Sequence, residues 1–138
     1  MKYKGYRSDA KKRRDDDLYA LYKHIVSERD SISFSDVASE IYRSSAPRFY
    51  VGVQRASIVV RAILKGGCIS SMYPERQMMY REIFARFLRE RESFPELSIE
   101  ELCARVIHRT APSFYMTLKS IMQTITVIRK ARRNATRK

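Results

Sequence analysis

Lysine and arginine residues are concentrated at the two ends of the 138-residue chain. Residues 1–14 contain seven basic residues and one acidic residue, and residues 129–138 contain six basic residues and no acidic one. The two ends thus carry twelve of the thirteen net positive charges. Such side chains neutralise phosphates and release counterions, which gives sequence-tolerant and salt-dependent binding. The candidate phosphate contacts are Lys2, Lys4, Arg7, Lys11, Lys12, Arg13, Arg14, Arg129, Lys130, Arg132 and Arg133.

These basic ends also have simpler explanations. Charged segments that bury little improve solubility or serve as localisation signals. Tyr3 and Tyr6 lie among the N-terminal basic residues. Their rings would stack on exposed bases in one interpretation and pack against the body of the protein in the other.

A second set of candidates lies along a long helix expected in each half of the chain. In each half we expect a shorter helix, a short break and then this longer helix, which is the order of a helix-turn-helix. Arginine and glutamine bind base edges in the major groove, while lysine, serine and threonine suit phosphate or base contacts. The candidates are Arg48, Gln54, Arg55 and Arg61 in the first half, and Ser113, Lys119, Ser120 and Thr126 in the second.

The same helix surface also carries apolar residues. Val51 and Ile58 would point away from the core stripe, which is unusual in a DNA groove and natural in a helix–helix contact. The stretch from Asp15 to Ile128 has a net charge of only about +1. Base recognition by these helices is therefore secondary to phosphate binding by the basic ends.

Few residues have the types and spacing of a catalytic or metal site. His24 and His108 lie on expected helices, with His108 at a solvent-facing position, and no Gly-rich phosphate loop or His/Cys ligand spacing is present. The run Asp15-Asp16-Asp17 is explained better as a helix cap than as a metal site. Cys103 has the pattern of a buried thiol in a reducing compartment. We expect no enzymatic activity, no metal and no cofactor.

An Ala-Pro-x-Phe-Tyr motif occurs twice, at residues 46–50 and 111–115. The constant offset of 65 residues also pairs apolar positions after the motif, such as Val53 with Leu118. Upstream the offset is 62, because three residues are inserted around Pro95. Insertions confined to a polar loop, with the apolar positions kept in phase, predict a tandem duplication.

The apolar periodicity favours helices throughout. Between Phe49 and Ile63 apolar residues recur at steps of four and three, and the same steps recur between Phe114 and Ile128. The β-branched runs at residues 58–60 and 124–128 leave strands as the alternative. Gly66-Gly67 would end the third helix. The expected helices span about Leu18–Arg29, Asp36–Ser44, Pro47–Lys65, Glu75–Arg91, Ser98–Arg109 and Pro112–Arg133.

The predicted fold is all-α, with two three-helix units in tandem. The boundaries are a flexible basic arm over residues 1–14, repeats over residues 15–67 and 68–128, and a basic tail over residues 129–138. Units of about 60 residues are marginal alone, so we expect the two to pack together. No apolar run approaches a membrane span, which predicts a soluble cytoplasmic or intraviral protein.

The doubled Ala-Pro-x-Phe-Tyr motif, with an apolar helix after each copy, resembles a set of small basic proteins from Bacteroides-type bacteria and their phages and mobile elements. The resemblance covers about residues 18–130 and implies an origin in a phage or mobile element. It assigns no activity and no functional residue.

The sequence as a whole predicts an accessory or regulatory protein that binds nucleic acid, with DNA favoured over RNA. The alternative is a virion or assembly protein whose helical body binds protein or a second copy of itself. In that case the basic ends would touch nucleic acid. Neither hypothesis involves a membrane partner.

Overall fold

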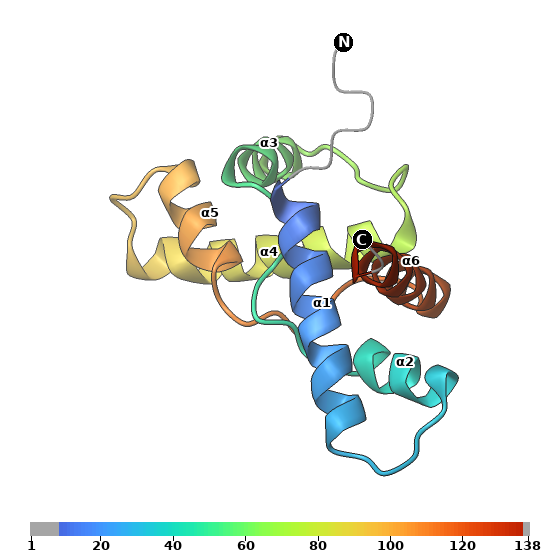
Figure 1. The fold of residues 1–138 in the computed structure, drawn as a ribbon. Helices are drawn as coiled ribbons and strands as arrows, with labels where there is room; N and C mark the ends of the chain where they lie inside the picture. Colours follow the sequence, from blue (N-terminus) through green and yellow to red (C-terminus); the bar gives the residue numbers. More distant parts are fainter. Residues whose placement is uncertain (1–8, 137–138) are drawn as a thin grey trace. The chain divides into compact units, whose positions relative to one another are not determined.

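The computed structural model describes residues 9–136, and this part of the chain forms six α-helices and no β-strand (Figure 1). The all-α prediction is confirmed, since the β-branched runs lie inside the third and sixth helices. No helix in the described range is long and apolar enough to cross a membrane. The helices are α1 (Asp9–Ser27), α2 (Phe34–Tyr42), α3 (Val53–Leu64), α4 (Pro74–Ser93), α5 (Ile99–Ile107) and α6 (Leu118–Thr136).

The helices form two compact units that do not follow the order of the chain. The first, which we call the terminal unit, combines residues 9–46 with residues 112–136 and contains α1, α2 and α6. The second, the central unit, is residues 47–111 and contains α3, α4 and α5. Helix α6 packs against α2 and α1, and α3 packs against α5 and α4. The third helix of each predicted repeat thus packs with the first two helices of the other.

The compact units therefore differ from the predicted segments 15–67 and 68–128. An apolar stripe shows that a helix buries one face, but it does not show which helix covers that face. The helix starts do keep the predicted spacing: α2 and α5 begin 65 residues apart, as do α3 and α6. The duplication itself remains a prediction, which this spacing supports.

Helices α3 and α6 begin six residues later than predicted, because the segments that contain Pro47 and Pro112 are not helical. In the first segment the Phe49 N–H donates a hydrogen bond to the Ile107 carbonyl at 3.0 Å, and the Phe49 side chain is buried. In the second segment Tyr115 has φ of 57°, a left-handed conformation that an α-helix does not accommodate. Each motif thus lies in a non-helical connection and has a buried phenylalanine ring.

Helix α1 begins at Asp9, so the predicted flexible arm is wrong over residues 9–14. The run Asp15-Asp16-Asp17 lies inside this helix and does not cap it. Asp15 is buried and accepts a hydrogen bond from the Arg14 guanidinium at 3.1 Å. Apolar periodicity could not predict this start, because residues 9–14 contain almost no apolar side chains. Lys2, Lys4 and Arg7 lie outside the described residues.

Several helix ends follow directly from local sequence. Ser33 and Ser98 are N-caps, and each side chain accepts a backbone N–H three residues later at 3.1 Å. At the other end of α3, Gly66 has φ of 89°, and the Gly67 N–H donates to the Ala62 carbonyl at 2.8 Å. This is a Schellman ending, as the Gly-Gly pair predicted.

Replacing Phe49 with alanine tests the burial of the motif ring. Phe49 is 2% exposed, so Phe49→Ala should lower the free energy of unfolding by about 3–5 kcal/mol. Tyr73→Ala is the control, because Tyr73 is 80% exposed and its loss should change stability by less than about 0.5 kcal/mol. Denaturant melts measure both values. A loss below about 1 kcal/mol for Phe49→Ala would contradict the burial of this ring.

Candidate nucleic-acid interface

The basic C-terminal segment is part of α6 over residues 129–136 and does not form a separate tail there. This helix contains no acidic residue, and the cations near its end have no carboxylate neighbour on the same helix. These four cations are all exposed, and they are Arg129, Lys130, Arg132 and Arg133.

Three aromatic side chains of the terminal unit form a cluster beside this segment. The rings of Tyr19 and Tyr22 stack with centroids 5.6 Å apart, and Phe34 meets Tyr22 edge-on at 6.5 Å. All three rings are half-buried. Tyr19 and Tyr22 are three residues apart on α1, which places them on one side of that helix. We call this group the aromatic cluster.

Two arginines of α6 lie over the rings of the aromatic cluster. The Arg132 guanidinium is 4.8 Å from the centre of the Tyr19 ring, and the Arg129 guanidinium is 5.9 Å from the centre of the Phe34 ring. The Lys23 ammonium is 5.3 Å from the Tyr19 ring. These are cation–π contacts, in which a positive charge lies over the face of an aromatic ring.

A guanidinium held in this way can still bind an anion. A guanidinium has five N–H donors, and a cation–π contact uses its charge without forming a hydrogen bond. Within the described residues, Arg129 and Arg132 make no ion pair or hydrogen bond in addition to these ring contacts. Their positive charges are therefore not offset by a carboxylate partner.

The first turns of α1 add further exposed cations to the same unit. Lys11, Lys12 and Arg13 are exposed, whereas Arg14 is half-buried and paired with Asp15. Lys12 is seven residues before Tyr19, so both lie on one side of α1. Helix α6 packs against this helix, with its C-terminal end beside α1 (Figure 1). Of the N-terminal candidates in the described range, Lys11, Lys12 and Arg13 are thus exposed and Arg14 is half-buried.

The helix-turn-helix predicted in each half is wrong in its connection. Ten residues separate α2 from α3 and α5 from α6, and the successive helices belong to different compact units. A helix-turn-helix needs a turn of three or four residues between packed helices. The sequence predicted the order of the helices. The non-helical motif segment, however, makes each connection longer than the turn of a helix-turn-helix.

The candidate groove residues have different surroundings in the structure. Gln54 and Arg55 are exposed in the first turn of α3, but Arg48 precedes the helix and is half-buried. Arg61 is half-buried and forms an ion pair with Glu100 of α5. In the second half, Lys119 is exposed in the first turn of α6. The predicted groove residues therefore differ in exposure and in pairing, and Gln54, Arg55 and Lys119 are the exposed ones.

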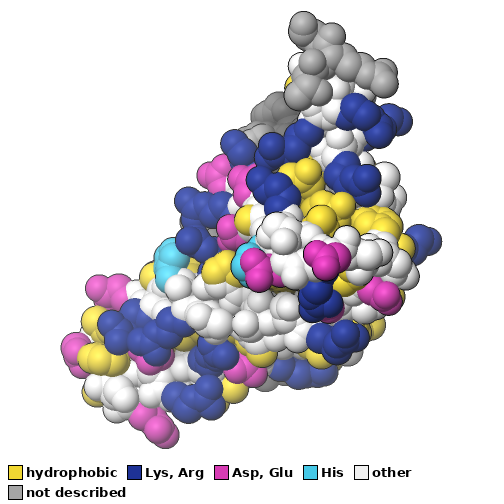
Figure 2. Space-filling view, turned by 60° about the horizontal axis from the view of Figure 1, so that its bottom comes forward, with side chains coloured by type: hydrophobic (Ala, Val, Ile, Leu, Met, Phe, Trp, Pro, Cys, Tyr) yellow, Lys and Arg dark blue, Asp and Glu magenta, His cyan; other side chains and the backbone are white. Residues whose placement is uncertain are grey.

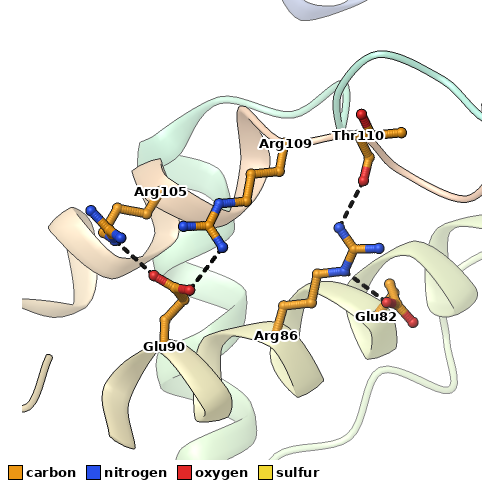
Figure 3. A network of polar contacts seen from close by, with 6 residues as sticks. All are labelled: Glu82, Arg86, Glu90, Arg105, Arg109 and Thr110. Atoms are coloured by element: carbon orange, nitrogen blue, oxygen red, sulfur yellow. Dashed lines mark hydrogen bonds and ion pairs between the residues drawn. The ribbon is translucent and has the colours of Figure 1, made fainter. Parts of the chain in front are cut away.

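A second arginine cluster, which sequence reasoning missed, lies in the central unit (Figure 3). Glu90 of α4 accepts from Arg105 at 2.7 Å and from Arg109 at 2.9 Å. Arg86, also on α4, pairs with Glu82 at 2.8 Å and donates to the Thr110 carbonyl at 2.7 Å. The spacing of Glu82 and Arg86 is typical of a helix pair. The contacts between α4 and α5 could not be predicted without the packing.

The hydrogen bond from Arg105 is the main reason that the pKa of Glu90 is lowered, with a further contribution from the charge of Arg109. Burial of this carboxyl acts in the opposite direction. Glu90 therefore stays ionised over a wider pH range than an ordinary glutamate. Its charge holds two arginine side chains in fixed positions at the end of α5.

Positive charge is not gathered into a single patch on the face shown in Figure 2. Lysine and arginine side chains are spread widely over it, with acidic side chains between them. Net charge alone therefore does not locate an interface. The exposure and the pairing of each cation decide where an anion can bind.

The two cysteines differ in their surroundings. Cys103 is buried, as the sequence predicted, and burial raises its pKa. Cys68 is exposed, and hydrogen bonds with the Ser70 side chain and backbone lower its pKa. His24 and His108 are exposed. Within the described range, no group of three or more His, Cys, Asp or Glu is placed to hold a metal ion.

Comparison with known proteins gives no assignment. No protein-family model matches the chain, and no curated protein or solved structure matches it significantly.

Replacing Glu90 tests the arginine cluster through its pH dependence. A carboxyl with a lowered pKa stabilises the fold above its ordinary pKa of 4.5, and this contribution is lost as the pH falls through the lowered value. Glu90→Gln should therefore reduce the free energy of unfolding at pH 7 by about 1 kcal/mol. The difference in the free energy of unfolding between this variant and the native chain should shrink as the pH falls through the lowered pKa of Glu90.

The control is Glu92→Gln, at an exposed residue that makes no ion pair within the described residues. Denaturant melts between pH 7 and pH 2 compare the two variants. If Glu90→Gln and Glu92→Gln follow the same pH profile, Glu90 does not have the stabilising role assigned to it.

Proposed function

We propose that the terminal unit binds the phosphate backbone of a nucleic acid, with DNA as the favoured partner. The surface consists of the last turns of α6 and the first turns of α1. The observation that carries the proposal is the position of Arg129 and Arg132. Both are exposed, held over aromatic rings and without a carboxylate partner in the described range.

Ring contacts make these arginines better phosphate ligands than free side chains. Holding a guanidinium over a ring restricts its rotamers before the ligand arrives, so less conformational entropy is lost on binding. The in-plane donors of Arg129 and Arg132 can then bind two phosphate oxygens in a bidentate manner. The aromatic cluster is thus a support for the cations, and its half-buried rings contact the ligand little.

Binding of this kind is sequence-tolerant and depends steeply on salt. Phosphate contacts position a protein on a duplex but carry no base information directly. About six contacts, from α6 and from Lys11, Lys12 and Arg13, would give a slope of about −5 for log affinity against log salt. The helical segments offer a fixed spacing of charges at 1.5 Å per residue, which a flexible arm does not.

Base recognition by α3 is the second part of the hypothesis. Gln54 and Arg55 are exposed at its start, but Ile58 on the same helix is 52% exposed, which suits a protein contact better than a groove. The alternative function, a virion or assembly protein, is favoured by this residue and by Val127 of α6, which is 61% exposed. An origin in a phage or mobile element is compatible with both functions.

The experiment is fluorescence anisotropy with a labelled 20-base-pair duplex across a salt series, using the full chain. The test variant replaces Lys130, Arg132 and Arg133 with glutamine. It should lower affinity at 100 mM salt by about tenfold or more and reduce the magnitude of the salt slope by about 2–3. A second duplex of unrelated sequence should give a similar affinity.

The matched control replaces Lys65, Arg76 and Arg81 of the central unit with glutamine. All three are exposed, and replacing them removes the same net charge as the test variant. Affinity should stay within about twofold, because the proposal places the phosphate contacts on the terminal unit. Circular dichroism checks that both variants keep their helices. The proposal fails if the native chain does not bind, or if the two variants weaken binding equally.

A further inference from the structure

The central unit contains a hollow that is lined by arginines. It has a volume of about 240 Å³ and lies where α4 packs against the end of α5. Val106 contributes an apolar side chain, and the other lining residues are charged. The lining residues are Arg86, Arg89, Glu90, Val106 and Arg109.

Two of these arginines are held in place by bonds that leave part of each guanidinium unused. Arg86 donates through Nε to Glu82 and through Nη1 to the Thr110 carbonyl, and Arg109 donates through Nη1 to Glu90 (Figure 3). A guanidinium has five N–H donors. Donors on both side chains therefore remain for a ligand, and the side chains need little ordering to present them.

The charge of the cluster favours an anion of low charge. The hollow and the ion pairs around it contain four arginines and two glutamates, so their net charge is +2. These residues are Arg86, Arg89, Arg105, Arg109, Glu82 and Glu90. Glu90 is in the lining, but its two carboxylate oxygens accept from Arg105 and Arg109. Its charge is thus offset by these partners and repels an incoming anion only weakly.

Arg89 is the residue that a purely structural role does not explain. The other arginines of this group hold α4 to the end of α5 or cover an aromatic ring. Arg89 lines the hollow, is exposed and makes no ion pair or hydrogen bond within the described residues. An unpaired arginine beside two held arginines is an arrangement that suits a phosphate, which takes several donors at once.

We propose that this hollow binds one phosphate group through Arg86, Arg89 and Arg109. The proposal rests on the proposed function for the source of the ligand, which would be a backbone phosphate of the bound nucleic acid. Free phosphate offers the same oxygens, so the chemistry of the site can be tested apart from nucleic-acid binding. The hollow would then be a phosphate contact on the central unit, distinct from the α6 surface.

The experiment follows the arginine Nε–H signals of the full chain by NMR at pH 6. The probes are inorganic phosphate in one titration and a short duplex in the other, with sodium chloride of equal ionic strength as the baseline. Arg89→Gln and Arg76→Gln assign the two signals by their disappearance. Arg76 is the matched residue, because it is also on α4, exposed and unpaired within the described range.

Both probes should shift the Arg89 signal more than the Arg76 signal. Arg89→Gln should also weaken duplex binding about threefold to tenfold, as expected for one lost phosphate contact, while Arg76→Gln leaves it unchanged. Thermal melts should show equal stability for the two variants, because neither side chain makes a bond that is lost.

Two results distinguish a failure of this phosphate site from a failure of the proposed nucleic-acid function. If phosphate shifts the Arg89 signal but the native chain binds no duplex, the site stands with free phosphate as its ligand and the nucleic-acid function fails. If neither probe shifts Arg89 more than Arg76, the phosphate site is overturned, whatever the affinity of α6 for DNA.

Discussion

Helix α6 is held in place by helices from the opposite end of the sequence. It packs against α2 and α1, and its last turns place Arg129 and Arg132 over rings of those two helices. A free helix of this length is marginal in water, because most helical stability in proteins comes from packing. Helix α3, in turn, packs with helices of the second half of the sequence in the central unit, where Arg61 is paired with Glu100. The packing of the third helices therefore decides which cations are available to a ligand.

The arginines of the protein serve two different purposes, and the structure distinguishes them by their partners. Arg105 and Arg109 are bound to Glu90, so they hold α5 to α4 and have fewer donors left for a ligand. Arg129 and Arg132 lie over aromatic rings and make no ion pair or hydrogen bond within the described residues. A net charge of +13 does not reveal this difference. It follows from whether a carboxylate or an aromatic ring lies beside each guanidinium.

Local features were predictable from the sequence, and the pairing of helices was not. The Gly66-Gly67 pair marked the end of α3 correctly, because it acts through hydrogen bonds to neighbouring residues. Ser33 and Ser98 cap α2 and α5 in the same local way. The motif prolines misplaced the starts of α3 and α6, since a proline suits an extended connection as well as a first helical turn. The contacts of Arg132 with Tyr19 join residues more than one hundred positions apart. No periodicity along the chain encodes such a pair.

The most direct test of this packing is to divide the chain between Ser70 and Ser71, in the connection between α3 and α4, and to measure helicity by circular dichroism. Each half then carries two helices of one compact unit and one helix of the other. Each half alone should be much less helical than the intact protein, and an equimolar mixture should regain the helicity as a one-to-one complex. If each half is fully helical alone and mixing adds nothing, α3 and α6 pack within their own halves, and the account is contradicted.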